Sequence, residues 1–129
     1  MIKVTADNSK ENYLVEIQSP TGNIVIADEP KEKGGEDKGL SPKELLASAL
    51  AACTCATVRM FCNRKGWDVK NVHIEIELVE EDGKTTFNRK LQLQGSLDEA
   101  QRHTLLNVAN ACPIHKILTH AIAVETVLI

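Results

Sequence analysis

The sequence is short of aromatic residues, which make up only 3% of its 129 residues. Its core must therefore be aliphatic, and so few rings make a poor platform for stacking nucleic-acid bases. An excess of positive charge is also missing, because 15 Lys and Arg stand against 18 Asp and Glu. Since nucleic-acid binding needs a concentrated basic surface, we expect no nucleic-acid partner.

Export signals and long apolar runs are lacking as well. Residues 1–6 alternate instead of forming the apolar run of a signal peptide, and no stretch approaches the ~20 apolar residues of a membrane span. We therefore expect a cytoplasmic protein with no membrane partner, and the length predicts a single domain over residues 1–129. In a reducing cytosol, where permanent disulfides are rare, the four cysteines are core filler, metal ligands or redox groups.

The order of secondary-structure signals predicts an α+β fold with about six strands and two principal helices. Two hairpins are indicated by alternating apolar residues on either side of turn sequences. A charged, glycine-containing loop without periodicity follows the first hairpin at residues 28–39, and we expect it to be mobile. The predicted strands are residues 1–6, 13–18, 23–27, 69–80, the return strand after the turn at 81–84, and 121–129.

Two capping boxes mark helix starts. Residues 41–44 open a helix that runs to about Lys65 and ends at Gly66, and residues 96–99 open a second helix to about Asn110. The first helix is apolar on nearly every side, so we expect it to be buried from several directions. In a chain this small, one thin sheet cannot cover every side of this helix. A homodimer in which the helix packs against the same helix of a second chain is the simplest way to bury it.

The long helix offers two thiol environments. At about 100° per residue, Cys53 and Cys55 point about 160° apart and cannot serve one small site together. Cys55 and Cys62 lie within ~20° of each other, near Glu44 and Arg59, whereas Cys53 shares an apolar face. Core filler is the simplest interpretation of a buried cysteine.

A second constellation is Cys112 with His115. Pro113 as first helical residue makes Cys112 the N-cap, where free amides and the helix dipole lower the pKa of a thiol. His115 comes round to the same side and can pair with the thiolate or move a proton. One hypothesis is therefore a thiol–disulfide oxidoreductase centred on these two residues. A zinc site at Cys53, Cys55, Cys112 and His115 is disfavoured, because two cysteines two apart on a helix diverge, and we expect neither metal nor cofactor.

Four segments carry a resemblance to a known family: residues 39–46, Ala52-Cys53-Thr54, Val58-Arg59-Met60 and Cys112-Pro113-Ile114-His115-Lys116. They resemble the OsmC/Ohr family of osmotically inducible and organic hydroperoxide resistance proteins, and the general OsmC-like subgroup most of all. The resemblance implies an α+β fold in which two chains intertwine as a homodimer. It also implies a stress-response antioxidant oxidoreductase, a peroxiredoxin-type thiol peroxidase acting on organic hydroperoxides.

On that analogy Cys53 matches the attacking cysteine and Cys112 the resolving one. Peroxide oxygen oxidises Cys53 to a sulfenic acid, Cys112 condenses with it to a disulfide, and a dithiol reductant restores both thiols. The helix dipole, in contrast, favours Cys112 as the more acidic sulfur.

The sequence departs from the family pattern at two places. Well-studied members bring an arginine from the N-terminal part to the attacking thiolate and carry a glutamate directly after the proline of the helix start. This chain has no arginine before Arg59, and Lys43 stands in the glutamate position. Arg59 and Glu44 are therefore candidate supporting residues, together with His115. The missing arginine and the apolar face around Cys53 motivate the alternative, a non-catalytic protein that binds a small hydrophobic ligand at the dimer interface.

Overall fold

A computed structural model of the chain describes residues 1–9 and 11–129. It is an α+β structure with two small antiparallel sheets, as the sequence predicts. The contacts divide the chain into two compact units, residues 1–46 and residues 47–129. The single domain over residues 1–129 stays a prediction.

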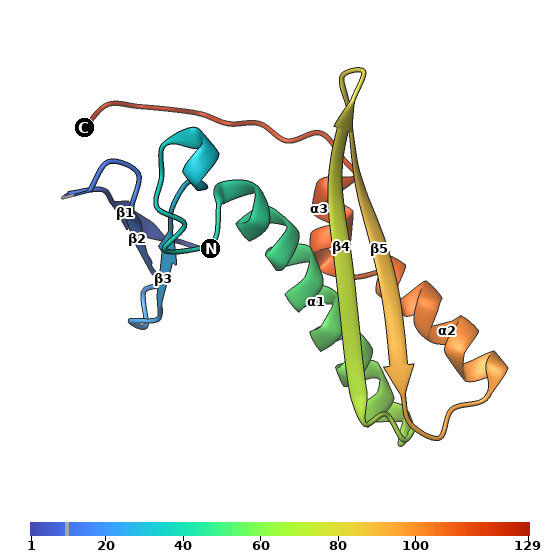
Figure 1. Ribbon diagram of the computed structural model, residues 1–129. Helices are drawn as coiled ribbons and strands as arrows, with labels where there is room; N and C mark the ends of the chain where they lie inside the picture. Colours follow the sequence, from blue (N-terminus) through green and yellow to red (C-terminus); the bar gives the residue numbers. More distant parts are fainter. Residues whose placement is uncertain (10) are drawn as a thin grey trace. The chain divides into compact units, whose positions relative to one another are not determined.

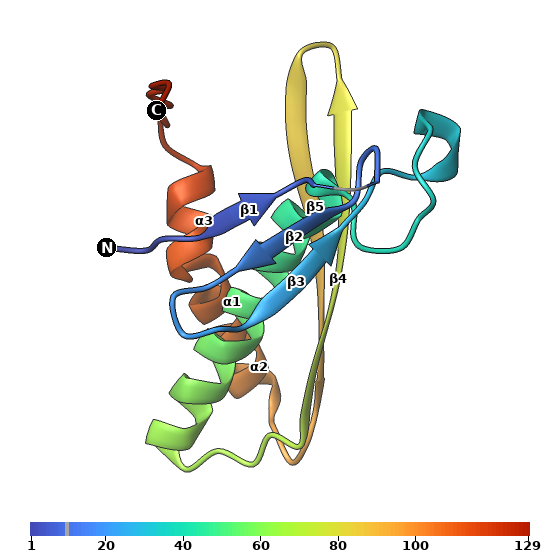
Figure 2. The ribbon, with the colours of Figure 1, turned by 90° about the vertical axis from the view of Figure 1, so that its left-hand side faces the viewer.

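The first unit holds a three-stranded antiparallel sheet in the order β1 (Thr5–Asp7), β2 (Val15–Gln18), β3 (Ile24–Ala27). Figure 2 shows the three strands side by side. The β2–β3 turn is closed by the Ser19 N–H, which donates to the Asn23 carbonyl at 2.9 Å. Gly22 takes a φ of 91°, which explains the glycine in this turn. The first hairpin and the third strand are therefore confirmed.

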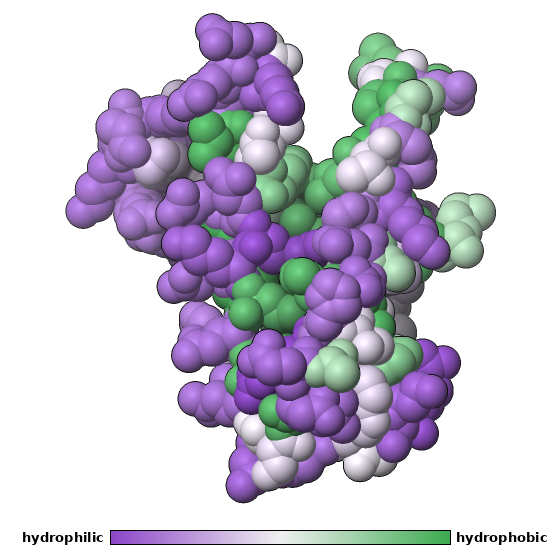
Figure 3. Space-filling model, turned by 90° about the vertical axis from the view of Figure 1, so that its right-hand side faces the viewer, coloured by the Kyte–Doolittle hydropathy of each residue, from purple (hydrophilic) through white to green (hydrophobic). Residues whose placement is uncertain are grey.

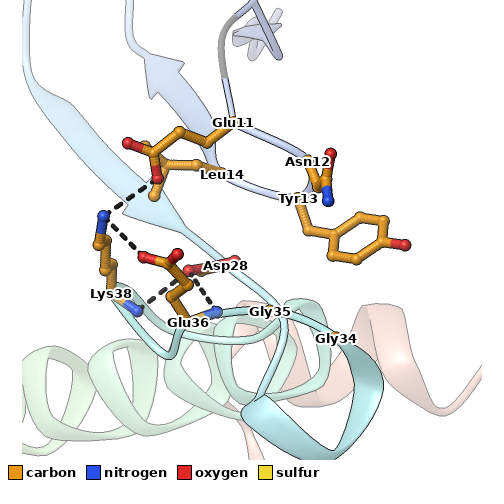
Figure 4. A pocket seen from close by; sticks show the side chains of 9 residues that line it. All are labelled: Glu11, Asn12, Tyr13, Leu14, Asp28, Gly34, Gly35, Glu36 and Lys38. Atoms are coloured by element: carbon orange, nitrogen blue, oxygen red, sulfur yellow. Dashed lines mark hydrogen bonds and ion pairs between the residues drawn. The ribbon is translucent and has the colours of Figure 1, made fainter.

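The loop after β3 is organised around one carboxylate, although the sequence predicts an irregular segment. Asp28 is buried, and its oxygens accept the backbone N–H groups of Glu29, Glu36 and Lys38 at 2.8, 3.2 and 3.1 Å. The short 3₁₀ helix η1 (Lys31–Lys33) lies between these donors. Figure 4 shows this carboxylate beside a cavity of about 280 Å³. A buried acid that collects backbone N–H groups gives the loop a defined path.

The long helix α1 (Pro42–Lys65) begins and ends as predicted. Ser41 and Glu44 form a capping box, since the Glu44 N–H donates to Ser41 Oγ at 3.2 Å and the Ser41 N–H donates to Glu44 Oε1 at 2.9 Å. Gly66 ends the helix with a φ of 69°.

A smaller part of the α1 surface is buried than the sequence predicts. Its buried residues form one stripe, Leu50, Thr54, Val58 and Cys62, whereas Met60 is 62% exposed. The expectation of burial from several directions is therefore wrong for the single chain. Among the helices of the described residues, α1 alone is long and apolar enough to cross a membrane, and core helices of soluble proteins share that property. The statement that no segment approaches a membrane span is corrected to that extent.

The second unit pairs β4 (Asn71–Glu81) with β5 (Lys84–Gln94) along their whole length. Asp82 and Gly83 take φ values of 51° and 75°, the left-handed conformation of a two-residue hairpin turn. In Figures 1 and 2 α1 runs beside this hairpin. The core of this unit consists of Val58 and Cys62 of α1, Val69 just before β4, and Leu105 and Ala109 of the helix that follows β5, with Val72, Leu91 and Leu93 of the hairpin packed against it.

The remaining helices are α2 (Glu99–Asn110) and α3 (Pro113–Leu118). The N-cap of α2 is Asp98, which forms a capping box with Gln101, so the predicted box at residues 96–99 is wrong by two residues. Residues 121–129 form no strand and are exposed. The described chain therefore has five strands where about six are predicted.

Candidate thiol site

The helix α1 presents two adjacent side chains with different burial. Thr54 lies in the buried stripe, and its hydroxyl donates to the Leu50 carbonyl at 2.7 Å. Cys53, one position earlier, is half-buried, with its Sγ 4.0 Å from Thr57 Oγ1. The helical rotation of about 100° per residue therefore leaves Cys53 at the edge of the stripe and places Thr54 inside it.

Cys112 lies at the beginning of α3 as its N-cap. Its backbone is extended, with φ −66° and ψ 146°, and its Sγ accepts the N–H of His115 at 3.3 Å. Pro113 occupies the first helical position, as predicted. The side chain of Cys112 is fully buried, at 0% exposure, and its sulfur is 3.8 Å from Thr54 Oγ1.

Arg89 of β5 joins these groups. Its Nη1 donates to Thr54 Oγ1 at 3.0 Å and lies 4.0 Å from the Cys112 Sγ. Its Nη2 donates to Asn110 Oδ1 at 2.9 Å and contacts His115 Nδ1 at 3.1 Å. We call the set Cys53, Thr54, Arg89, Cys112 and His115 the thiol cluster.

The Arg89 contact fixes the protonation pattern of His115. A guanidinium has five N–H donors and no acceptor, so Nδ1 of the imidazole must accept the hydrogen bond. The proton of the neutral ring is then on Nε2. The ring therefore acts as an acceptor toward Arg89 and as a donor on its far side.

The thiol cluster lowers the pKa of Cys112. Burial alone raises it, but the His115 N–H, the Thr54 hydroxyl, the side-chain interaction with Cys53 and the positive charge of Arg89 together outweigh burial. The thiolate of Cys112 is thus favoured inside a buried site, and Cys53 is a direct neighbour of it. The predicted N-cap position and the approach of His115 are both present in the structure.

The predicted supporting residues Arg59 and Glu44 have other partners. Arg59 donates to the Val69 carbonyl at 2.6 Å and to the Lys70 carbonyl at 3.4 Å. The Glu44 carboxylate accepts the Ser41 N–H, which lowers its pKa. Of the five predicted site residues, the structure brings Cys53, Cys112 and His115 together through direct contacts with Cys112, and Arg89 and Thr54 add further contacts to Cys112.

Sequence reasoning missed Arg89 and Thr54, although each leaves a signal. Arg89 falls between Phe87 and Leu91 on the inward side of β5, where a period-2 strand is otherwise apolar. A charged residue at such a position needs a partner in the interior. Thr54 places a hydroxyl group in the most apolar helix of the chain, directly after Cys53.

The other two cysteines, which the helical wheel places together on a face away from Cys53, lie outside the thiol cluster. The Cys55 Sγ lies 3.8 Å from the Val72 carbonyl, and Cys62 belongs to the apolar core. Burial raises the pKa of Cys62, and the charge of Arg59 opposes this only in part. Within the described residues, no three His, Cys, Asp or Glu side chains gather as metal ligands would.

A cavity of about 480 Å³ adjoins the thiol cluster. Arg89 and His115 line it together with apolar side chains from α1, β5, α2 and α3. Figure 3 shows hydrophobic surface in the middle of the molecular face that it draws, bordered by polar residues. The apolar lining residues are Leu50, Phe87, Leu91, Leu106, Ala109 and Leu118.

Comparisons with known proteins agree with this fold. A family model described as OsmC-like protein matches residues 35–127. The OsmC-like protein from Mycoplasma pneumoniae superposes with a TM-score of 0.76 at 21% identity, covering 92% of this chain and 86% of that chain. No curated protein matches the chain.

Two further solved structures carry names that refer to hydroperoxides. The organic hydroperoxide resistance protein OsmC from Legionella pneumophila has a TM-score of 0.66 at 19% identity, covering 92% of this chain and 89% of that chain. The organic hydroperoxide resistance protein OhrB of Bacillus subtilis has a TM-score of 0.62 at 22% identity, covering 92% and 90%. At these identities the likeness concerns the fold.

Proposed function

The chain belongs to the OsmC-like protein family, and from that premise we propose that it is a thiol peroxidase that reduces organic hydroperoxides. The observation that carries the proposal is the meeting of Cys53 and Cys112, far apart in the sequence, around a guanidinium that favours a thiolate. The hydroperoxide resistance proteins of the same fold support the choice of substrate.

The difference in exposure supports a division of labour between the two sulfurs. Cys53 is half-buried and is the sulfur that a substrate reaches, whereas Cys112 is fully buried behind it. The thiolate of Cys112 takes the proton of Cys53 as the Cys53 sulfur attacks the peroxide. The O–O bond then breaks, one oxygen stays on Cys53 as a sulfenic acid, and the other leaves as the alcohol after receiving that proton.

The second half of the cycle restores the thiols. Cys112, again a thiolate, attacks the Cys53 sulfur, a disulfide forms, and the hydroxide that leaves takes a proton from the solvent to become water. A dithiol reductant then supplies two electrons and two protons and regenerates both thiols. No cofactor is needed, because the two sulfurs carry both electrons.

Arg89 supplies the cation that the N-terminal part of this chain lacks. It stands at the thiolate from β5, held in place by Asn110 and His115. A guanidinium fixed by two neighbours favours the thiolate in every turnover without having to be reorganised. Arg59 and Glu44, engaged with backbone groups elsewhere, are not required for this mechanism.

A second copy of the chain is the proposed partner. Beside Cys53, α1 carries an exposed face of Ala49, Ala52, Ala56 and Met60. An apolar face of small residues lets two helices approach closely, so we infer a homodimer that covers it. Sedimentation should give twice the chain mass, and Ala56→Glu should give single chains. The free cysteines suit a reducing compartment, and we place the protein in the cytoplasm.

The experiment that tests the activity is a thiol count. Reduced protein is treated with cumene hydroperoxide, and we expect the loss of two thiols per chain together with formation of cumyl alcohol. Cys53→Ser should abolish both, whereas Cys55→Ser, on the same helix but outside the thiol cluster, should leave both unchanged. Persistence of all thiols at millimolar peroxide would contradict the proposal.

The cavity supports a second candidate function, non-catalytic binding of a small hydrophobic ligand. Its volume of about 480 Å³ and the apolar part of its lining suit such a ligand, while Lys84, Thr85, Thr86, Asn110 and Thr119 add polar groups. Native mass spectrometry of the purified protein should then reveal a bound lipid that Cys53→Ala does not displace. An empty cavity together with peroxide-dependent thiol loss would refute ligand binding and support the peroxidase.

A further inference from the structure

The short helix α3 depends on one sulfur atom. It has six residues, and helices of that length do not persist in water without support from outside. Pro113 has no N–H, and the N–H of His115 donates to the Cys112 Sγ. At the other end, the Thr119 hydroxyl donates to the His115 carbonyl at 2.9 Å. The sulfur is therefore the side-chain acceptor at the beginning of the helix.

The same sulfur is enclosed. Cys112 is at 0% exposure, with Thr54 of α1, Arg89 of β5 and His115 of α3 around it. A macromolecular dithiol cannot attack the Cys112 sulfur of a disulfide while α3 remains in place, although the half-buried Cys53 sulfur is more accessible. Attack at the Cys112 sulfur therefore needs a movement, and α3 is the smallest element of the enclosure.

We propose that α3 is a redox-sensitive cover, folded over the Cys112 sulfur in the reduced protein and loosened when the Cys53–Cys112 disulfide forms. The inference rests on the proposed function only for the identity of the oxidant. Any two-electron oxidant serves: the two sulfurs lose two electrons and two protons, which reduce a hydroperoxide to alcohol and water or the N=N bond of diamide to the hydrazine.

Two interactions are lost when the bridge forms. The sulfurs must approach to about 2.05 Å, which draws Cys112 Sγ toward α1 and away from the His115 N–H. The sulfur becomes neutral, so the charge-assisted contact with Arg89 disappears. Arg89 keeps its bonds to Asn110 and His115 but loses its anion. Without the Cys112 Sγ as acceptor for the His115 N–H, the first turn of α3 loses its side-chain cap.

The experiment is hydrogen–deuterium exchange measured by mass spectrometry on the full chain, reduced and after oxidation with diamide. Non-reducing peptide mapping first establishes the Cys53–Cys112 bridge. We expect exchange in peptides spanning residues 113–118 to become about five- to tenfold faster in the oxidised protein, the size typical of a lost N-cap. Peptides from α2 should exchange at the same rate in both states. Cys53→Ser, which cannot form the bridge, should show no change on diamide treatment.

Two substitutions at Cys112 separate the cap from the chemistry. Serine is a good N-cap, so Cys112→Ser should keep α3 protected under both conditions. Alanine has no acceptor, so Cys112→Ala should show the fast exchange without any oxidant. Equal protection of α3 in these two variants would overturn the role of the cap even if both variants are less stable overall.

The outcomes keep this inference distinct from the proposed function. If diamide loosens α3 but the protein consumes no hydroperoxide, the proposal of a redox-sensitive cover is supported and the peroxidase is refuted. Turnover of hydroperoxide with equal protection of α3 in the reduced and the oxidised protein would support the peroxidase and refute the cover. Failure of diamide to join Cys53 to Cys112 would overturn both.

Discussion

Cys62 and Cys112 are equally buried, at 0% exposure, and yet the pKa of one is raised and that of the other is lowered. Around Cys62 burial dominates, because apolar side chains surround it and only the charge of Arg59 opposes. Around Cys112 burial acts in the same direction, but N–H, hydroxyl and thiol groups and the charge of Arg89 outweigh it. Burial therefore does not decide whether a cysteine is reactive; the donors that point at it do.

This contrast also explains how one helix serves two purposes. Its buried stripe carries Cys62 at the core end and Thr54 at the site end. At the core end the stripe meets aliphatic side chains, and Cys62 fills space. At the site end it meets the guanidinium of Arg89 and the N-terminus of α3. The matched cysteines provide the controls for the first two predictions below.

The largest expected effect is on disulfide formation. With Cys112→Ser, hydroperoxide should oxidise Cys53 but the bridge should be absent, because no second thiol is in reach. Dimedone labelling with mass spectrometry should then trap a sulfenic acid at Cys53. Cys62→Ala should still form the bridge in full. A sulfenic acid trapped on Cys112 in the Cys53→Ser variant, with none on Cys53, would reverse the assigned roles.

Removal of the guanidinium comes next. Arg89→Met should raise the pKa of Cys112, because it removes a neighbouring positive charge that lowers it. Arg89→Lys keeps the charge and should have a smaller effect. Alkylation of each cysteine by iodoacetamide, followed against pH by mass spectrometry, measures the change.

The control for this prediction is the arginine near the other buried cysteine. Arg59→Met should raise the pKa of Cys62 and leave that of Cys112 unchanged, because the charge of Arg59 acts on Cys62. If both arginine variants shift both cysteines equally, the two sites are not electrostatically separate and the contrast between them fails.

Loss of the Thr54 hydroxyl should have a moderate effect on stability. Thr54→Val removes the 3.0 Å acceptor of the Arg89 Nη1, and a hydrogen bond to a charged group contributes about 1.5–3 kcal/mol. Thr54→Ser keeps the hydroxyl and should cost less. Urea unfolding followed by the fluorescence of Trp67 measures the free energy of unfolding. Equal stability of the Val and Ser variants would show that the hydroxyl is dispensable.

Elements with a local signal could be predicted from the sequence. The Ser41 and Glu44 box, the Gly66 terminator and the Cys112 N-cap each depend on neighbours in the chain, and all are present. The helical wheel also separated Cys53 from Cys55, because the rotation per residue is a constant of the helix. Residues 121–129 have the pattern of a strand but no paired strand in the described chain, and a strand needs one.

Side chains that act across the fold could not be predicted in the same way. Arg59 shares α1 with the cysteines, which makes it a candidate from the sequence, but its side chain reaches the carbonyls of Val69 and Lys70. Arg89 lies on a strand distant in sequence from both thiols, and only the pairing of β5 with the rest of the unit brings it there. The N-cap of α2 shows the same limit on a small scale, since residues 96–99 and Asp98 with Gln101 both fit a capping pattern and packing decides.

The smallest expected effect tests the same principle on an oxygen acid. Asp28 is only 4% exposed, and its pKa lies below the ordinary value of 3.8, chiefly because the Lys38 N–H donates to it, with burial opposing and the N–H groups of Glu29 and Glu36 adding. Since the folded pKa is the lower one, the stabilisation is complete above that ordinary value and is lost as pH falls through the folded pKa.

The loop after β3 should therefore loosen only below about pH 4, which NMR titration of the Glu36 and Lys38 amide resonances can follow. Asp28→Asn should remove this acid-dependent step, because the side chain no longer titrates and its amide group turns a donor toward a backbone donor. Asp37→Asn, an exposed acid in the same loop, should leave the step in place. If the acid-dependent step survives in Asp28→Asn, another group organises the loop. The explanation by hydrogen-bond donors that point at a buried acid would then hold for Cys112 but not for Asp28.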